Sequence, residues 1–378
     1  MDSFTLRSAN EIAFGSGTRR QVGKLAAAFG RRALLVTGRG AARRGLVDEF
    51  SSLLGDAGLA VAVFDAVEPE PSLQTVDAGR EALRAAEADV VIALGGGSAL
   101  DVGKAIGALA HHPEPVEHYF AGGHEITGPA APVIALPTTS GTGAEVTPNS
   151  VLSDPALRHK ASIRGLALMP RVAIVDPELT LGLPPEQTAF SGLDALVQAI
   201  ESYTSTGVNV VSDMYAEAAT LRLGRALRRA VADGSDLPAR EDMALGSLLA
   251  GLALASARLG LVHGLAHPLG VMYHLPHGRV CGWLMPTVMR FNRAAAGERY
   301  AHLADRLGLA PTAEALITWF EELAADLGAC GSWADAGLRE ADFDRLTEIA
   351  VPAGSSKYNP RQVTAEGVRD VLGELLRA

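Results

Sequence analysis

The sequence predicts an α/β domain with a Rossmann-like parallel sheet, followed by a domain made only of helices. Short apolar runs rich in β-branched residues recur through the first half of the chain. Between the first three of them lie segments whose apolar residues repeat at intervals of three and four, which is typical of amphipathic helices. After "DPELTLGLPP", residues 176–185, strand signals nearly vanish and long Ala/Leu-rich segments follow. Strands that alternate with helices indicate βαβ units and a parallel sheet.

Each expected element follows from a local pattern. The apolar runs predict strands, and the first three begin about 28 residues apart, the spacing of βαβ units. Strands are expected at 33–37, 61–64, 89–94, 132–137 and 172–176. In the second half, helices are expected at 186–204, 208–231, 241–258, 261–272, 296–307, 311–327, 339–350 and 364–377. Pro184 and Pro185 mark the boundary, so we expect an α/β nucleotide-binding domain over 1–182 and an all-helical metal and substrate domain over 183–378.

Composition excludes several classes of partner. The 33 basic and 43 acidic residues give a net charge of -10, which repels nucleic acid and anionic lipid. The two cysteines, Cys281 and Cys330, form no metal-ligand spacing and no disulfide framework, which indicates a reducing cytoplasm. No signal peptide is recognised at the start of the sequence. The apolar stretch 248–273 contains Arg258, so we expect it to be buried in the protein and not to span a membrane.

Two glycine-rich loops point to a bound nucleotide. In "GGGSALDVGKAIG", residues 95–107, three glycines stand between a strand and a helix. Glycine lets backbone N–H groups approach an anion, and a helix N-terminus favours negative charge, so this turn is predicted to hold a phosphate. "LPTTSGTGAEVT", residues 136–147, again follows a strand and combines glycines with hydroxyls. Neither loop is the GxGxxG motif of standard dinucleotide-binding folds.

Histidines and carboxylates in the second half point to a metal. "HGLAHPLGVMYHLPHG", residues 263–278, places His263 and His267 four residues apart on one helix face. "SGLDALVQAIESY", residues 191–203, places Asp194, Gln198 and Glu201 on one face of an apolar helix. A buried carboxylate needs a partner. A divalent metal held by one carboxylate and two imidazoles, with one position open, provides that partner.

These motifs, with "DPELT" at 176–180 and "NPRQVT" at 359–364, occur in an order that closely resembles the iron-containing (group III) alcohol dehydrogenases. The resemblance spans roughly residues 12–375. It implies a dehydroquinate synthase-like fold, in which an α/β domain binds a nicotinamide cofactor and a helical domain holds a metal in the cleft between them.

The resemblance also implies roles for individual residues. The pyrophosphate of the cofactor falls on the glycine turn, the second loop completes the nucleotide site, and a lysine approaches the cofactor. The implied cofactor-binding residues are Gly95, Gly96, Gly97, Ser98, Asp101, Thr138, Thr139, Thr142 and Lys160. The implied metal ligands are Asp194, His263 and His277, and His267 matches a non-ligand histidine close to the nicotinamide.

Gln198 departs from the family pattern at the metal site. The family usually has a histidine at this position, four residues after the ligand aspartate. A neutral amide oxygen is a weaker ligand than imidazole and suits a softer metal such as Fe²⁺ poorly. Related glycerol dehydrogenases bind zinc with one aspartate and two histidines. Three alternatives therefore stay open: a site that holds Zn²⁺, one that holds Fe²⁺ loosely, and a metal-poor site, with Gln198 as the fourth candidate ligand.

Gly38 and Arg39 depart from the family pattern at the nucleotide site. NAD-preferring members usually place an aspartate after the first strand, where it binds the ribose hydroxyls and repels a 2'-phosphate. Gly38 stands there, followed by Arg39, with Arg43 and Arg44 nearby. The missing carboxylate and the positive charge favour NADP(H), while NAD(H) stays an alternative.

The expected reaction is reversible hydride transfer between the nicotinamide and a small alcohol or aldehyde, with Asp194 on the metal and His267 as the proton relay. Three alternatives remain. A metal-free reductase like maleylacetate reductase is disfavoured by "TTSGTG" and by Asp194. A lyase like the sugar-phosphate cyclases needs more basic residues in the helical half. A nucleotide-binding protein without catalysis leaves the histidine cluster unexplained. The resemblance favours a homodimer.

Overall fold

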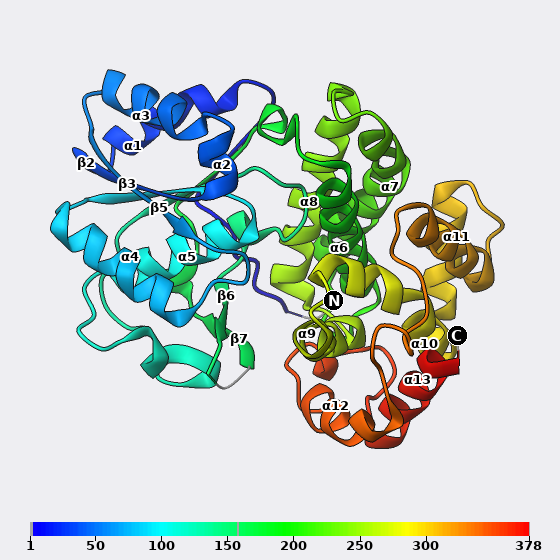
Figure 1. Cartoon of the computed structure of the whole chain (residues 1–378). Helices are drawn as coiled ribbons and strands as arrows, with labels where there is room; N and C mark the ends of the chain where they lie inside the picture. The colour runs from blue at the N-terminus through cyan, green and yellow to red at the C-terminus, as the bar shows by residue number, and fades with distance from the viewer. Residues whose placement is uncertain (1–2, 157–158, 378) are drawn as a thin grey trace. The chain divides into compact units, whose positions relative to one another are not determined.

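The computed structural model describes residues 3–156 and 159–377 and divides them into two compact units (Figure 1). The first unit contains residues 7–181 and is an α/β fold. The second contains residues 182–377, all of it helix and connecting loop, together with residues 3–6. The structural division thus lies one position before the expected one, and residues 3–6 group with the helical unit.

The α/β unit is built on one sheet of six parallel strands in the order β1-β8-β5-β4-β2-β3. All five expected strands are present, and the short β1 adds a sixth at the edge. A run of four residues is too short to show periodicity, which is why the sequence pattern did not reveal β1. The strands are β1 (Glu11–Phe14), β2 (Arg32–Gly38), β3 (Ala60–Val67), β4 (Val90–Gly95), β5 (Val133–Pro137) and β8 (Val172–Val175).

Helices cover both faces of this sheet because successive side chains of a strand point to opposite sides. Leu34 and Val36 of β2 pack with α4 (Leu73–Ala85) and α5 (Gly97–Ala108). Ala33 and Leu35 of the same strand pack with α1 (Val22–Ala27) and α3 (Leu46–Asp56) on the other face. The short α2 (Arg39–Arg43) follows β2 directly. The unit is therefore a doubly wound, Rossmann-like fold, as the sequence predicts.

A small antiparallel hairpin, which the sequence analysis did not anticipate, packs against α5. Its strands are β6 (Asn149–Asp154) and β7 (His159–Arg164). Asp101 of α5 holds the hairpin, because its carboxylate accepts a hydrogen bond from the Val151 N–H at 3.0 Å. The backbone carbonyl of Asp101 also accepts a hydrogen bond from the Ser150 hydroxyl at 2.9 Å.

The helical unit is arranged around α6, which is buried along nearly its whole length and packs against α7, α8 and α10. Most expected helices are present with ends shifted by a few residues. One expectation is wrong: α10 begins at His277 and not at residue 296, so the segment with Pro286 is helical as well. The helices are α6 (Pro185–Thr204), α7 (Val210–Ala232), α8 (Leu237–Ala257), α9 (Leu261–Tyr273), α10 (His277–Leu307), α11 (Ala313–Asp326), α12 (Phe343–Ala350) and α13 (Ala365–Arg377).

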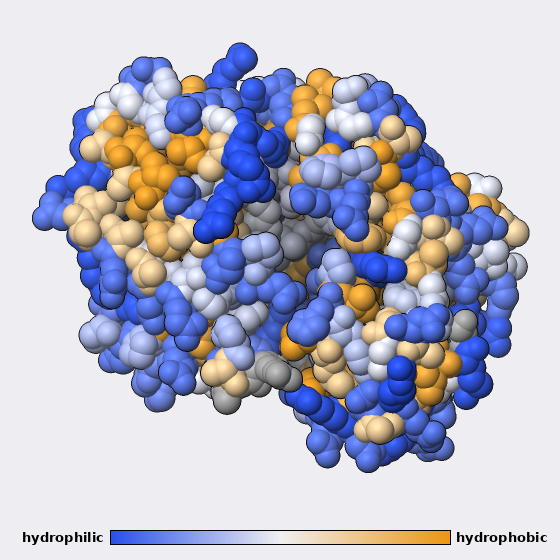
Figure 2. Space-filling model, viewed as in Figure 1, coloured by the Kyte–Doolittle hydropathy of each residue, from blue (hydrophilic) through white to orange (hydrophobic). Residues whose placement is uncertain are grey.

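Within the described residues, no single helix has both the length and the apolar composition to cross a membrane. Only α8 and α9 taken together pass that test, and they are bent by 108° at the break between them. Figure 2 shows mostly hydrophilic side chains on the visible face, with apolar patches between them. One exposed apolar side chain lies on the edge strand β3, where Val63 is 43% exposed.

Candidate metal and nucleotide sites

The candidate metal site begins on α6 with three polar residues on one buried face. Asp194, Gln198 and Glu201 are each only 4% exposed. Their spacing of four and three residues puts them above one another on the helix. Carboxylates removed from water in this way are stable only when hydrogen bonds or opposite charges compensate them.

Helix α9 provides that compensation through His263. The Nε2 atom of His263 lies 3.3 Å from Asp194 Oδ1, and its Nδ1 atom lies 2.6 Å from Glu201 Oε2. Glu201 also accepts a hydrogen bond from the Val262 N–H at 2.7 Å, which fixes its carboxylate against the start of α9. Glu201 therefore orients the imidazole so that Nε2 faces Asp194. The sequence placed Glu201 on the correct face but assigned it no role.

Helix α10 brings His277 to the same place because two glycines let it approach α6 closely. A Cβ atom on Gly278 would lie 2.0 Å from the Phe190 carbonyl oxygen, and one on Gly282 would lie 2.9 Å from the Leu193 side chain. With these glycines, His277 Nε2 comes within 3.8 Å of Asp194 Oδ1. Gly278 and Gly282 are thus the condition for close packing of α10 against α6.

The ligand atoms of Asp194, His263, His277 and Cys281 all lie within 4.8 Å of one another. The structure therefore brings the three sequence-predicted ligands together and adds a cysteine. The sequence analysis compared the two cysteines only with each other, whereas Cys281 follows His277 by one helical turn and its sulfur belongs to this group of candidate ligand atoms.

Electrostatics at His263 show how strongly the carboxylates attract a cation. Burial alone would lower the pKa of His263, but the hydrogen bonds with Asp194 and Glu201 outweigh burial and raise the pKa to about 10. Without a metal, the site thus collects a proton between its two carboxylates. A divalent cation satisfies the same negative charge, and its binding releases protons from the ligands.

The donor set fits a divalent metal. Carboxylate oxygen and imidazole nitrogen are ligands for both zinc and iron. Gln198, one helical turn after Asp194, has a buried Oε1 atom without a hydrogen-bond partner in the part of the chain that the structure describes. A buried carbonyl oxygen in that state indicates a missing donor or cation.

His267, predicted as the proton relay, lies one helical turn after His263 on α9 and is half-buried. Its ring stacks on the ring of His277, with centroids 4.8 Å apart and planes inclined by 11°. The structure therefore places His267 beside a candidate ligand, outside the group of four ligand atoms.

The glycine turn of the α/β unit joins β4 to the N-terminus of α5. Gly95 has φ 151°, which favours glycine, and Gly96 caps α5 without a side-chain hydrogen bond. A Cβ atom on Gly97 would lie 2.6 Å from Thr142 Cγ2, so the second loop lies directly against this turn. The backbone N–H groups at the start of α5, including that of Ser98, are placed to bind an anion.

The second loop leaves β5, the neighbour of β4 in the sheet. The Thr138 N–H donates to the Gly95 carbonyl at 2.9 Å, which ties the two loops together. Thr139 and Thr142 approach the glycine turn from this loop, since the nearest atoms to added Cβ atoms on Gly96 and Gly97 belong to them. The two loops that the sequence singled out thus form one surface at the carboxyl end of the parallel strands.

Two other predicted cofactor residues take part in ion pairs. Asp101 is 8% exposed and lies 2.9 Å from the buried Lys104 ammonium, in addition to its contact with the hairpin. Lys160 lies on β7 and pairs with Glu70 at 2.9 Å. Both side chains therefore have a structural function, which the sequence pattern did not indicate.

At the end of β2, Gly38 is extended and precedes Arg39, the first residue of α2. Arg39 and Arg43 are exposed. Arg44 donates to the carbonyls of Leu179 and Leu181 at 2.7 and 2.8 Å, so its guanidinium is engaged in the fold. The positive charge expected near this strand end is therefore carried by Arg39 and Arg43.

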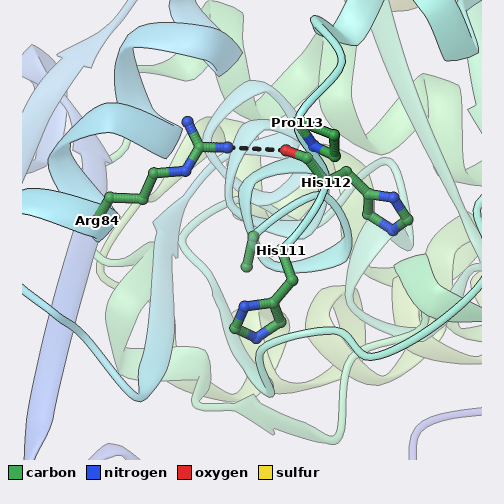
Figure 3. Close-up of a pocket in the computed structure, with 5 residues that line it drawn as sticks. Arg84, His111, His112 and Pro113 are labelled. Atoms are coloured by element: carbon green, nitrogen blue, oxygen red, sulfur yellow. Dashed lines mark hydrogen bonds between the residues drawn. The ribbon is translucent and has the colours of Figure 1, made fainter.

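A hollow of about 390 Å³ lies at the C-terminal end of α5, away from the glycine turn and the second loop (Figure 3). It is lined by Arg84 and by the segment 110–113 that follows the helix. Arg84 donates to the His112 carbonyl at 2.8 Å, and Arg80 donates to the Leu109 carbonyl at 3.1 Å. Cationic side chains stabilise the carbonyls at a helix C-terminus, which accounts for these arginines.

Comparison with known proteins agrees with this geometry. The family model "Iron-containing alcohol dehydrogenase" matches residues 9–177, and "Fe-containing alcohol dehydrogenase family, C-terminal" matches residues 188–376. The 1,3-propanediol dehydrogenase of Citrobacter freundii is 41% identical over 352 residues, covering 91% of each chain. The NAD-dependent methanol dehydrogenase of Bacillus methanolicus is 35% identical and covers all of both chains.

A solved structure supports the same assignment. The crystal structure of a 1,3-propanediol oxidoreductase superposes with a TM-score of 0.94 at 38% identity, covering 99% of this chain and 100% of the other. The fold, the two family models and these relatives agree along nearly the whole sequence. The chain belongs to the iron-containing alcohol dehydrogenase family and is an oxidoreductase that interconverts alcohols and aldehydes.

Proposed function

We propose that this chain interconverts a small primary alcohol and its aldehyde, with NADP(H) or NAD(H) as hydride carrier and a divalent metal on Asp194, His263 and His277. The observation that carries this proposal is the convergence of these three side chains, from three different helices, on one buried place. Buried acidic and imidazole groups converge in this way where a cation compensates them.

The metal is Fe²⁺ or Zn²⁺, and when bound it supplies a Lewis acid that polarises the substrate oxygen. Asp194 contributes a negative charge that balances part of the cation, and Gln198 offers a neutral amide oxygen on the same helix face. Glu201 fixes His263 through Nδ1, which leaves Nε2 for the ligand role.

The nucleotide is proposed to lie over the two joined loops of the α/β unit. The start of α5 at Gly96, Gly97 and Ser98 would donate backbone hydrogen bonds to the pyrophosphate. Thr138, Thr139 and Thr142 would complete this surface with hydroxyls. The nicotinamide supplies the hydride when the cofactor is bound.

We propose a preference for NADP(H). No carboxylate stands at Gly38 to repel a 2'-phosphate, and the exposed Arg39 follows it directly. The methanol dehydrogenase of Bacillus methanolicus is named as NAD-dependent, so NAD(H) stays the alternative that the test below must separate from NADP(H).

His267 is proposed to move the proton between the substrate oxygen and water. Its ring lies outside the group of four ligand atoms and stacks on the ring of His277, which fixes the ring plane beside the proposed metal site. Positioned imidazoles are the commonest general acids and bases in enzymes.

The substrate class follows from the relatives, which are named for 1,3-propanediol and methanol. The test is a panel of small alcohols and aldehydes assayed with both cofactors, combined with elemental analysis of the purified protein. We expect turnover of at least one small aldehyde, with higher kcat/KM for NADPH. A tenfold preference for NADH would contradict the cofactor proposal, and absence of turnover across the panel would contradict the substrate class.

A cytoplasmic homodimer is also proposed. Neither cysteine forms a disulfide in the structure, in keeping with a reducing compartment. Light scattering on the purified full chain measures the assembly directly, and a monomer at micromolar concentration would contradict the dimer.

A further inference from the structure

Cys281 lies inside the group of candidate metal ligands. Its side chain is fully buried, and it follows His277 by one turn of α10. The Sγ atom lies 3.5 Å from His277 Nε2 and within 4.8 Å of the ligand atoms of Asp194 and His263. The inference below rests on the proposed metal site and concerns its fourth ligand.

The distances between these atoms match those of a tetrahedral site. With metal–ligand bonds of about 2.0–2.3 Å, ligand atoms of a tetrahedron lie about 3.3–3.6 Å apart. Three edges of the group measure 3.3 Å from Asp194 to His263, 3.8 Å from Asp194 to His277 and 3.5 Å from His277 to Cys281. Since no remaining pair exceeds 4.8 Å, all four ligand atoms lie close enough together to bind one ion, and a substrate oxygen would add as a fifth ligand.

Charge distinguishes Cys281 from Gln198, the other candidate for the fourth position. Gln198 offers a neutral amide oxygen, whereas a cysteine bound to a metal is a thiolate. The attraction between a negative thiolate and a divalent cation is stronger than the attraction of a neutral amide dipole, and in a buried site water does not screen it.

We propose that Cys281 is the fourth protein ligand of the divalent metal and binds it as a thiolate. The thiol proton leaves for solvent when the cation binds, so no redox partner is required. A sulfur ligand makes the site softer than an oxygen ligand at the same position would. The sulfur ligand therefore increases the preference of the site for zinc.

Cobalt substitution tests the proposal without relying on activity. The metal-free full-length protein is loaded with one equivalent of Co²⁺, and its spectrum is recorded. Visible d–d bands report that Co²⁺ is bound in an ordered site, and a near-ultraviolet charge-transfer band reports a sulfur ligand. We expect both in the wild type.

The chain offers a matched control, because its only other cysteine is the exposed Cys330. The Cys330→Ser variant retains Cys281 alone, so a charge-transfer band in this variant assigns the sulfur ligand to Cys281. The substitution leaves the buried core unchanged. The Cys281→Ser variant is expected to lose that band, to keep the d–d bands, and to bind Zn²⁺ at least about tenfold more weakly.

Two outcomes overturn different claims. Intense d–d bands without a charge-transfer band in the Cys330→Ser variant would refute Cys281 as a ligand and leave the proposed metal site intact. No d–d bands in the wild type, with no Co²⁺ retained after gel filtration, would refute the metal site itself and the Cys281 ligand with it.

Discussion

Glu201 holds His263 through a hydrogen bond of 2.6 Å from Nδ1 to Oε2, while the opposite ring nitrogen lies 3.3 Å from Asp194. The imidazole is thus clamped between two buried carboxylates from one helix. A carboxylate behind a ligand histidine sets its tautomer and raises its basicity, which strengthens metal binding.

The Glu201→Gln variant is therefore expected to bind Zn²⁺ about 10–100 times more weakly, because a neutral amide replaces the carboxylate behind His263. Competition with a chromophoric chelator measures the affinity. Thr204→Ala is the control, since Thr204 is buried on the same helix and donates to backbone carbonyls of that helix and not to His263. Equal Zn²⁺ affinities for the wild type and Glu201→Gln would show that the Glu201 carboxylate does not strengthen metal binding by His263.

The His267→Gln variant is expected to lower kcat by about 10²–10⁴, because loss of a positioned proton donor or acceptor costs this much. Metal content and KM should stay near wild type, since His267 lies outside the ligand group. His274→Asn is the control: His274 is exposed and has φ 54°, which asparagine tolerates. Loss of metal together with activity would instead identify His267 as a support for the ligands.

The Gly97→Ala variant is expected to weaken NADPH binding at least about tenfold, because a methyl group would occupy the approach of the phosphate to the start of α5. The added Cβ atom would also lie 2.6 Å from Thr142 Cγ2 and displace the second loop. Fluorescence titration of NADPH measures the Kd. Gly55→Ala is the control, as no atom lies within 4 Å of a Cβ atom there. An unchanged Kd in Gly97→Ala would place the phosphate elsewhere.

Glu145 makes the stability of the protein depend on pH. Burial raises the pKa of Glu145 to about 7, while a backbone hydrogen bond and the charge of Lys104 act in the opposite direction. The unfolded chain loses this proton near pH 4.5, and the folded protein loses it near pH 7. Between these two pH values the folded protein therefore holds one proton more than the unfolded chain. The free energy of unfolding therefore falls as the pH rises through this interval, by on the order of 3 kcal/mol for this group.

Glu145→Gln removes this dependence, so the variant should melt higher than wild type at pH 8 and nearly equally at pH 4.5. Thermal unfolding of the full chain, followed at both pH values, tests this. Glu125→Gln, a change at an exposed loop carboxylate, should leave the profile unchanged. A Glu145→Gln variant that is less stable at pH 8 would mean that the charged carboxylate stabilises the fold.

The sequence predicted the two-part architecture because strand and helix periodicities are strong in long segments, and most expected elements are present. It missed the start of α10, since Gly278, Gly282 and Pro286 resemble helix breakers in a single sequence. Only the close contact with α6 explains these glycines, and that contact is tertiary.

The candidate site was likewise predictable in part. Asp194, His263 and His277 stood out by residue type and motif, and the structure brings them together. Cys281 did not, and Glu201 stood out only by its helix face and without a role, because the relation of both to the site depends on how three helices pack. Asp101 and Arg44 show the converse: both lie in suggestive motifs, yet Asp101 pairs with Lys104 and Arg44 binds two backbone carbonyls.

Turnover of the metal-free protein tests the central claim most directly. The full-length chain is stripped with a strong chelator, shown by elemental analysis to contain no divalent metal, and assayed on its best aldehyde. The metal site predicts no measurable turnover until Fe²⁺ or Zn²⁺ is added back, and no recovery in the His263→Ala variant. Full turnover by the demonstrably metal-free wild type would contradict the account.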